Sequence, residues 1–314
     1  MARGLYRVYL YVVTIALAGF ATFSLSYLLG ELFRLTPLRG GHLTVDRSTV
    51  SDLLALPRTW AGYELIVTVG VAAAQRVLAS RDNGALPPTL CLLVPRRAFE
   101  DLLKAGAGEA RKQISAIYLD QPISRQLNLI ALAMPEATRI GILFGPTSVG
   151  LEDEVREAAR ARGLIVRSAD VGRATDVYPA LQKVLRESDV LLALPDSVAL
   201  NASTVRGILV TSYRTGVPVM GFSQALVDAG AVIGAYSTER QQGREGAEVA
   251  ARFLAGESLP RPAYPRYFTV GVNFNAARGL GVAVDNEATL AAELAVRDRD
   301  PPASRDASRA GSRP

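Results

Sequence analysis

The sequence predicts an α/β fold in which helices cover parallel sheets and the chain is divided between two Rossmann-like lobes. The first observation is a unit that repeats nearly three times between Gly141 and Ser223: a short β-branched strand, a small or polar turn, and an amphipathic helix. The second is the run of residues 189–194, which is apolar on both faces like a parallel strand covered by helices. The third is size, because 314 residues with 49% apolar and 21% charged side chains give room for two lobes.

The second lobe is expected over residues 138–296 and contains most of the predicted strands. These strands cover residues 139–144, 164–168, 189–194, 217–222 and 231–236. The helices between them place apolar side chains on one face, as Leu181 and Leu185 do. A long helix over 239–255, a proline-rich crossing segment, a last strand over 267–274 and two short helices complete the lobe. Strands and helices that alternate in this order predict right-handed crossovers and a doubly wound sheet.

The first lobe is expected over residues 60–137 and has fewer strands. They are predicted at residues 64–70, 89–94 and 115–119. Gly70 lets the chain turn sharply from the first of these strands into a helix whose free amides face the strand end. With three strands against five or six in the second lobe, we expect the first lobe to be curtailed.

The amino-terminal residues 1–35 are predicted to form a membrane anchor or a signal segment. From Val8 to Leu29 the chain has 22 residues without a charge, enough to span a bilayer as a helix. Small residues within the run leave cleavage of a signal peptide open, whereas the continuation of the apolar run past them favours an uncleaved anchor. Residues 36–59 are expected to be a linker, and residues 297–314 a disordered tail.

The composition argues against several kinds of chemistry. His42 is the only histidine and lies outside either lobe, so histidine-based catalysis is not expected. Cys91 is the only cysteine and lies in an apolar run, which favours a buried structural thiol over a nucleophile. The sequence has no cluster at metal-ligand spacing, and its basic residues are scattered rather than arranged in a stripe for nucleic acid. We therefore expect no enzyme, no metal, no cofactor and no nucleic-acid partner.

Five segments together resemble one known family. They are residues 65–70 with 73–75, then 139–146, 194–197, 243–247 and 272–277. In this order they resemble the ABC-transporter substrate-binding proteins of the tryptophan/tyrosine-binding type, and the resemblance covers residues 62–282. It implies a type 1 periplasmic-binding-protein fold, in which two lobes joined by a hinge close on a small ligand such as an amino acid. It also implies an ABC permease as partner, and a place on the periplasmic side of the bacterial inner membrane, anchored or secreted.

The sequence departs from that family in two places. Members usually have a strand, a helix and a strand before the segment that matches residues 64–70, and here the membrane segment and linker occupy that space. We therefore expect the central strand of the first lobe to be absent. Residues 94–97 read Val-Pro-Arg-Arg where members have a small Ser/Asp-containing loop. An alternative function follows, a membrane-anchored sensor or accessory protein that uses the lobe fold for protein contact.

The candidate ligand-binding residues are those at the carboxyl ends of strands, where ligands of doubly wound sheets lie. For the first lobe they are Thr68, Gly70, Ala72, Tyr118, Asp120 and Gln121. For the second lobe they are Thr147, Ser148, Asp196, Ser197, Phe222, Ser223 and Tyr236. Backbone amides at helix starts would receive a carboxylate, an acidic residue would receive an amino group, and aromatic residues would stack on a ligand ring.

Each candidate also has a structural interpretation. Asp196 and Ser197 are suited to turn the chain after Pro195. Tyr118 alternates with apolar residues in a strand and fits a core position equally well. Asp120 is placed to cap the helix that follows it.

Overall fold

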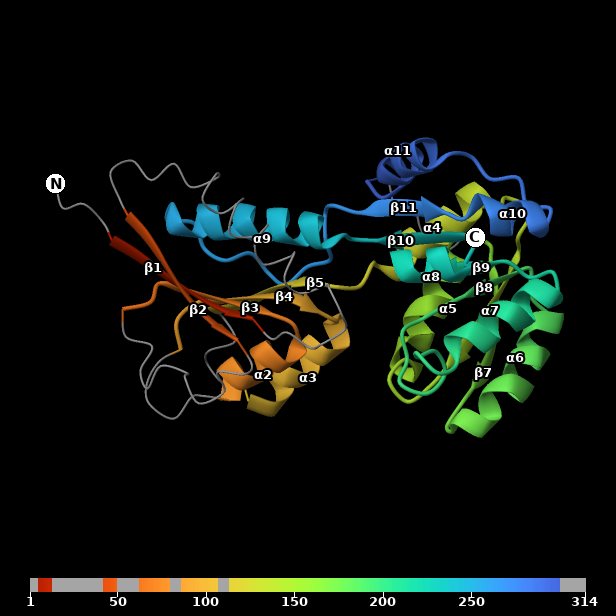
Figure 1. The fold of residues 1–314 in the computed structure, drawn as a ribbon, viewed down its shortest axis with the longest axis horizontal. Coiled ribbons are helices and arrows are strands. Elements are labelled where there is room, and N and C mark those ends of the chain that lie inside the picture. Colours follow the sequence, from red (N-terminus) through yellow and green to blue (C-terminus); the bar gives the residue numbers. More distant parts are fainter. Residues whose placement is uncertain (1–4, 13–41, 50–61, 80–85, 107–112, 300–314) are drawn as a thin grey trace, which may run out of the picture. The chain divides into compact units, whose positions relative to one another are not determined.

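The computed structural model describes residues 5–12, 42–49, 62–79, 86–106 and 113–299, which belong to two compact units (Figure 1). The first unit takes Met1–Asp120 and Ser237–Phe268, and the second takes Gln121–Tyr236 and Thr269–Pro314. The chain therefore passes from one unit to the other three times. This division differs from the predicted boundaries, because a predicted first-lobe helix belongs to the second unit and a predicted second-lobe helix to the first.

The first unit contains a five-stranded sheet in the order β2-β1-β3-β4-β5, and every neighbouring pair is parallel. Its strands are β1 (Leu5–Val12), β2 (His42–Thr49), β3 (Leu65–Val69), β4 (Thr89–Val94) and β5 (Ile114–Tyr118). Its helices are α2 (Val71–Ala79), α3 (Arg96–Gly106) and α9 (Glu239–Leu254). Leu65 and Val67 pack in a core with Ala247 of α9, whereas Ile66 packs in a second core with α2 and α3. Successive side chains of β3 point to opposite faces of the sheet, and helices bury both of these faces.

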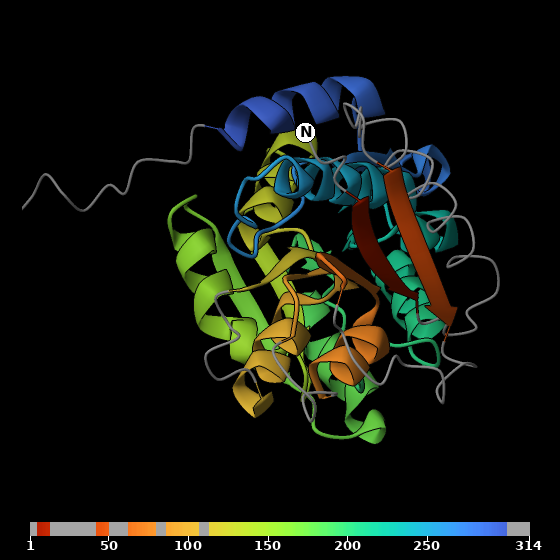
Figure 2. The same cartoon turned by 90° about the vertical axis from the view of Figure 1, so that its left-hand side faces the viewer.

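The amino-terminal strand β1 corrects two predictions. It pairs with β2 on one side and with β3 on the other, with Val8 opposite Leu65 (Figure 1, Figure 2). The predicted membrane helix therefore starts with a strand over residues 8–12, and its remainder, residues 13–29, lies outside the described residues. The interior position that we expected to be empty in this sheet is filled by β1. No helix within the described ranges is long and apolar enough to cross a membrane.

Local composition explains this difference. The β1 residues read Leu-Tyr-Arg-Val-Tyr-Leu-Tyr-Val, which are mostly aromatic and aliphatic residues that favour strands. The length of the charge-free run indicates a membrane helix, whereas the strand propensity of its first residues favours β1. The predicted linker over 36–59 likewise contains a strand, β2. The predicted tail over 297–314 starts too early, because Arg297 is the last residue of helix α11 (Glu287–Arg297) and residues 298–299 form a turn; residues 300–314 lie outside the described residues.

The second unit contains a six-stranded sheet in the order β11-β10-β9-β8-β6-β7, in which only the pair β10 and β11 is antiparallel. Its strands are β6 (Arg139–Phe144), β7 (Ile165–Asp170), β8 (Val190–Leu192), β9 (Val219–Gly221), β10 (Ile233–Tyr236) and β11 (Thr269–Val272). The prediction of an α/β fold with parallel sheets is confirmed, and all six predicted strands of this region are present, β6 with the predicted bounds and the other five with shifted ends.

Helices cover both faces of the second sheet. They are α4 (Ile123–Ala133), α5 (Glu152–Arg160), α6 (Val177–Arg186), α7 (Val205–Arg214), α8 (Gln224–Ala229), α10 (Phe274–Gly279) and α11 (Glu287–Arg297). Side chains of α6, α7 and α8 share one core over one face, as Leu181, Ile208 and Leu226 do. Helix α4 packs against α5 and α11 on the other face (Figure 1). Because the helices cover the faces of the sheet, the edge at the carboxyl ends of the parallel strands is formed by the loops that follow those strands.

Candidate ligand-binding site

Asp196 organises the carboxyl edge of the second sheet. Its Oδ2 atom accepts hydrogen bonds from the amide and hydroxyl of Thr147, at 3.0 and 2.9 Å, and from the amide and hydroxyl of Ser148, both at 2.9 Å. Its Oδ1 atom accepts from the amides of Val198 and Ala199, both at 2.8 Å. One buried carboxylate therefore fixes the loop after β6 to the loop after β8.

The neighbouring residues are fitted to this carboxylate. A Cβ atom added to Gly145 would lie 2.0 Å from Asp196 Oδ1, so only glycine fits at the end of β6. Burial raises the pKa of Asp196, but the amides of Ala199 and Val198 and the two hydroxyl groups outweigh this effect, and the net pKa is lowered. The group is consequently ionised at neutral pH. A carboxylate offers about four lone-pair sites, and six donors already surround this one, so it has no capacity left for a ligand's ammonium group.

Two of the three serines at this edge hold the protein's own loops and helices in place. Ser148 is fully buried, and its hydroxyl accepts a hydrogen bond from the amide of Gly145 at 2.9 Å. Ser223 is the N-cap of α8, because its hydroxyl accepts from the amide of Leu226 at 3.3 Å. Thr147 and Ser197 are exposed at the surface of the same loops. Accessible hydroxyl groups at this edge thus come from Thr147 and Ser197.

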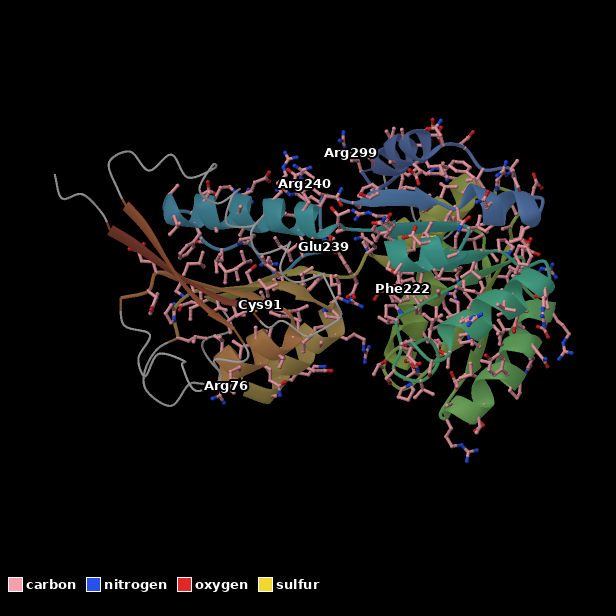
Figure 3. All side chains as sticks on the ribbon, viewed as in Figure 1. Arg76, Cys91, Phe222, Glu239, Arg240 and Arg299 are labelled. Atoms are coloured by element: carbon pink, nitrogen blue, oxygen red, sulfur yellow. The ribbon has the colours of Figure 1, made fainter. Side chains whose placement is uncertain are left out.

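Two aromatic side chains at this edge are partly exposed. Phe222 follows β9 (Figure 3), and Tyr236 ends β10. The Tyr236 ring lies over Gly271 of the neighbouring strand β11, where an added Cβ atom would be 3.0 Å from the phenol oxygen. Burial raises the pKa of Tyr236, and the carboxylates of Glu287 and Asp228 raise it further. These rings are the apolar surfaces that the second unit offers at its strand ends.

At the first unit's strand ends, Thr68 points into the core. Its side chain is fully buried and lies beside the thiol of Cys91 on the adjacent strand β4 (Figure 3). Gly70 has a φ of 90°, and its amide donates to the carbonyl of Leu92 at 2.8 Å. The chain then enters α2, and no described residue accepts a hydrogen bond from the amides of residues 71–73. These amides, including that of Ala72, form the polar group of this edge.

Tyr118 belongs to the core of the first unit. Its side chain is 8% exposed and packs edge to face against Phe99 and Tyr264, with ring centroids 5.9 and 5.4 Å away. Its carbonyl accepts a hydrogen bond from Gln242 Nε2 at 2.8 Å. The structural interpretation of Tyr118 therefore fits these contacts better than a ligand-stacking role.

Asp120 and Gln121 both have structural partners. Asp120 Oδ2 accepts from the amide of Arg96 at 2.6 Å, so it caps α3 and not the helix that follows it. Gln121 is buried in the second unit, and its Oε1 accepts from Arg125 Nη1 at 2.6 Å. Asp120 therefore supplies an acidic side chain at the carboxyl edge of the first unit's sheet, whereas Gln121 belongs to the second unit.

Two residues at this edge were not among the candidates from the sequence. The guanidinium group of Arg96 lies 5.7 Å from the ring centre of Tyr264. Leu93, three residues before Arg96, has a φ of 55° and lies at a register shift between β4 and β5. The unusual Val-Pro-Arg-Arg run at residues 94–97 was a signal for Arg96. Tyr264 lies in a proline-rich stretch that returns to this sheet. No local pattern in the sequence predicted that return.

The described pocket of the second unit lies elsewhere. It has a volume of about 920 Å³ and is lined by residues such as Met134, Asp189 and Pro218, which precede or begin strands. It is thus at the amino ends of the strands. Asp189 accepts hydrogen bonds from Thr138 and Arg139 there and fixes the start of β6. Since ligands of such sheets lie beyond the opposite ends, we do not take this pocket as the functional site.

Two α/β units with mainly parallel sheets and three chain crossings define a type 1 periplasmic-binding-protein-like fold. The family model described as ABC transporter substrate binding protein matches residues 51–295, and the chain belongs to this family. Members of this family are extracytoplasmic solute-binding proteins and not enzymes. Comparison with curated protein sequences gives no match.

Solved structures share the fold at low sequence identity. A ligand-free, open substrate-binding protein with adhesive properties from Clostridium difficile is 17% identical, with a TM-score of 0.68 over 90% of this chain and 96% of that one. An ABC domain in complex with L-Trp from Streptococcus pneumonia is 15% identical, with a TM-score of 0.59 over 92% and 98%. An ABC transporter substrate-binding protein from Desulfitobacterium hafniense in complex with Leu is 15% identical, with a TM-score of 0.55 over 88% of each chain.

Proposed function

We propose that this protein is the extracytoplasmic solute-binding protein of an ABC importer and binds an amino acid between its two lobes without chemistry. An ABC permease in the inner membrane would receive the ligand. The observation that carries the proposal is the ordered carboxyl edge of the second sheet, where Asp196 fixes two loops. Pre-ordered loops reduce the entropy lost on binding a small ligand. The family match and the amino-acid complexes of similar structures support the same class of ligand.

The polar and apolar groups at the strand ends of the two units suit the carboxylate, the ammonium group and the side chain of an amino acid. The amides at the start of α2, including that of Ala72, have no acceptor among the described residues and are donors for a carboxylate. Phe222 and Tyr236 offer partly exposed rings to an apolar or aromatic side chain. Asp196 has no remaining lone pairs, so we assign the ammonium group to Asp120 and to the exposed hydroxyl groups of Thr147 and Ser197.

A thermal-shift screen of the twenty amino acids at millimolar concentration tests the proposal. A ligand at one hundred times its Kd stabilises the folded protein by about 2.7 kcal/mol, which raises Tm by several degrees. Calorimetry then gives the affinity for each amino acid that stabilises the protein. Stabilisation by none of them would count against the proposal.

A matched pair of variants locates the site. Phe222→Ala is expected to weaken binding at least tenfold. Phe274→Ala removes an exposed ring at the start of α10, just after β11. Because β11 is antiparallel to β10, this ring lies at the edge opposite the carboxyl ends of the parallel strands, and its removal is expected to leave Kd unchanged. Equal effects of the two substitutions would contradict the assignment. The alternative function, a sensor or accessory protein, depended on an anchor and a curtailed lobe, and no described element favours it.

A further inference from the structure

One side of the second unit is unusually basic. The positions of helices α6, α7 and α10 can be followed in Figure 1. Their sequences contain five basic side chains and no acidic one. These are Lys183, Arg186, Arg206, Arg214 and Arg278. Helices α4, α5 and α11 on the other side carry six acidic and four basic side chains. The two sides of one sheet thus differ in the sign of their charge.

The basic charges on α6 and α7 are not neutralised locally. In the part of the chain that the structure describes, none of their four basic residues pairs with a carboxylate. The acidic residues that flank α6 are paired with other arginines: Asp176 lies 3.4 Å from Arg173, and Glu187 lies 3.7 Å from Arg167. Helix α8 adds one acidic residue, Asp228, on this side. The outer surface of α6, α7 and α10, which we call the basic face, therefore has an excess of positive charge.

The same three helices carry exposed apolar side chains. Tyr178, Val210, Tyr213 and Phe274 are between 44% and 50% exposed. Tyr178 of α6 lies across α7, because a Cβ added to Gly207 would be 1.5 Å from its hydroxyl oxygen. Tyr213 of α7 lies across α10 at Gly279 in the same way, at 2.2 Å. These contacts join the three helices into one continuous surface of aromatic and basic residues, which no single stretch of the sequence contains.

We propose that the basic face binds the anionic surface of a lipid bilayer. Arginine side chains pair with headgroup phosphates, and tyrosine and phenylalanine rings enter the interfacial layer, where aromatic residues are enriched. The rings are half exposed and dispersed among arginines, whereas a protein partner is usually anchored by side chains in fully desolvated pockets. This surface contains none of the candidate ligand-binding residues, so the inference is independent of the proposed ligand.

Flotation of the full-length protein with vesicles tests this inference. Vesicles of phosphatidylcholine with about 30% phosphatidylglycerol are compared with vesicles of phosphatidylcholine alone, at about 0.05 M and 0.5 M NaCl. We expect binding that requires the anionic lipid and is lost at high salt. Binding that is equal for the two lipid compositions would overturn the inference.

Two double variants with the same change in net charge place the effect on the basic face. Each basic residue near an anionic membrane contributes roughly a fivefold factor to partitioning, so R206E/R214E is expected to lower it at least about twentyfold. R160E/R297E changes exposed arginines of α5 and α11 and is expected to lower partitioning less than about threefold. Far-UV circular dichroism confirms that both variants are folded. Equal losses would mean that net charge alone matters and would refute a specific face.

A neutral substitution tests the aromatic component. Phe274→Ser keeps the charge and is expected to lower partitioning into anionic vesicles about threefold, because interfacial binding scales with buried apolar area. No change on this substitution would overturn the assignment of the rings to the lipid interface. Salt-dependent binding to poly-L-glutamate or duplex DNA, without binding to vesicles, would assign the basic face to an acidic macromolecule and overturn the membrane proposal.

Discussion

Replacing Asp196 by asparagine tests whether one carboxylate holds the ligand-facing loops in place. The asparagine carbonyl can still accept from the amides of Val198 and Ala199, but its NH₂ group then faces the four donors of Thr147 and Ser148. The two hydroxyl groups can rotate to other acceptors. The amide of Ser148 also donates to the carbonyl of Gly145 at 3.1 Å and keeps that partner. The amide of Thr147 loses its acceptor, and an unsatisfied buried donor costs about 1–3 kcal/mol. We therefore expect the free energy of unfolding to fall by about 1–3 kcal/mol.

The effect should also depend on pH with a defined sign. Because the native pKa of Asp196 is lowered, its stabilisation is complete above the unfolded-state pKa of about 4 and is lost as the pH falls through the native value. Asparagine does not titrate. The difference in stability between the native sequence and Asp196→Asn should therefore be constant from about pH 5 to 7 and shrink below about pH 4.

Denaturation by urea, followed by circular dichroism at several pH values, measures both effects. Asp285→Asn is the matched control, because Asp285 is exposed, and we expect it to change stability by less than about 0.5 kcal/mol. An Asp196→Asn protein as stable as this control at pH 7 would refute the structural role of the carboxylate. A stability difference that persists unchanged at acid pH would refute the role of its charge.

Two further predictions concern buried positions. Gly145→Ala places a Cβ atom 2.0 Å from Asp196 Oδ1 and is expected to lower the free energy of unfolding by about 2–4 kcal/mol, whereas Gly172→Ala, with no atom within 4 Å, should cost under about 1 kcal/mol. Equal losses in urea denaturation would contradict this packing. Burial raises the pKa of Cys91 to about 11, although Thr68 lowers it in part, so the thiol is protonated at pH 8. Reaction with an aromatic disulfide reagent should be at least about one hundredfold slower in the native protein than in denaturant, and a fast native reaction would show that the site is open.

The repeating strands and helices of the second unit could be predicted because their patterns are local. Strand β6 and the stripe of Leu181 on α6 follow from the spacing of apolar residues alone. Strand β1 could not, since its place between β2 and β3 depends on pairing with residues 37 and 57 positions further along the chain. A charge-free run contains no information on that pairing.

The candidate site could be predicted by position but not by orientation. Asp196 follows a strand, as expected, yet only the structure shows that six donors of its own chain surround it. Thr68 and Tyr118 lie near strand ends but point into the core. Whether a strand side chain is buried depends on which helices cover the face it points to, and α9 reaches β3 from more than 170 residues along the chain.

The three crossings of the chain also constrain the order in which the protein is built during synthesis. The first unit ends at residue 120 and resumes only at residue 237, with α9 in the resumed part. Until the ribosome has released that helix, the apolar face of β3 formed by Leu65 and Val67 has no cover. The nascent first unit must therefore wait, partly uncovered, while residues 121–236 of the second unit are translated, and this interval is when the chain depends most on factors that shield apolar surface.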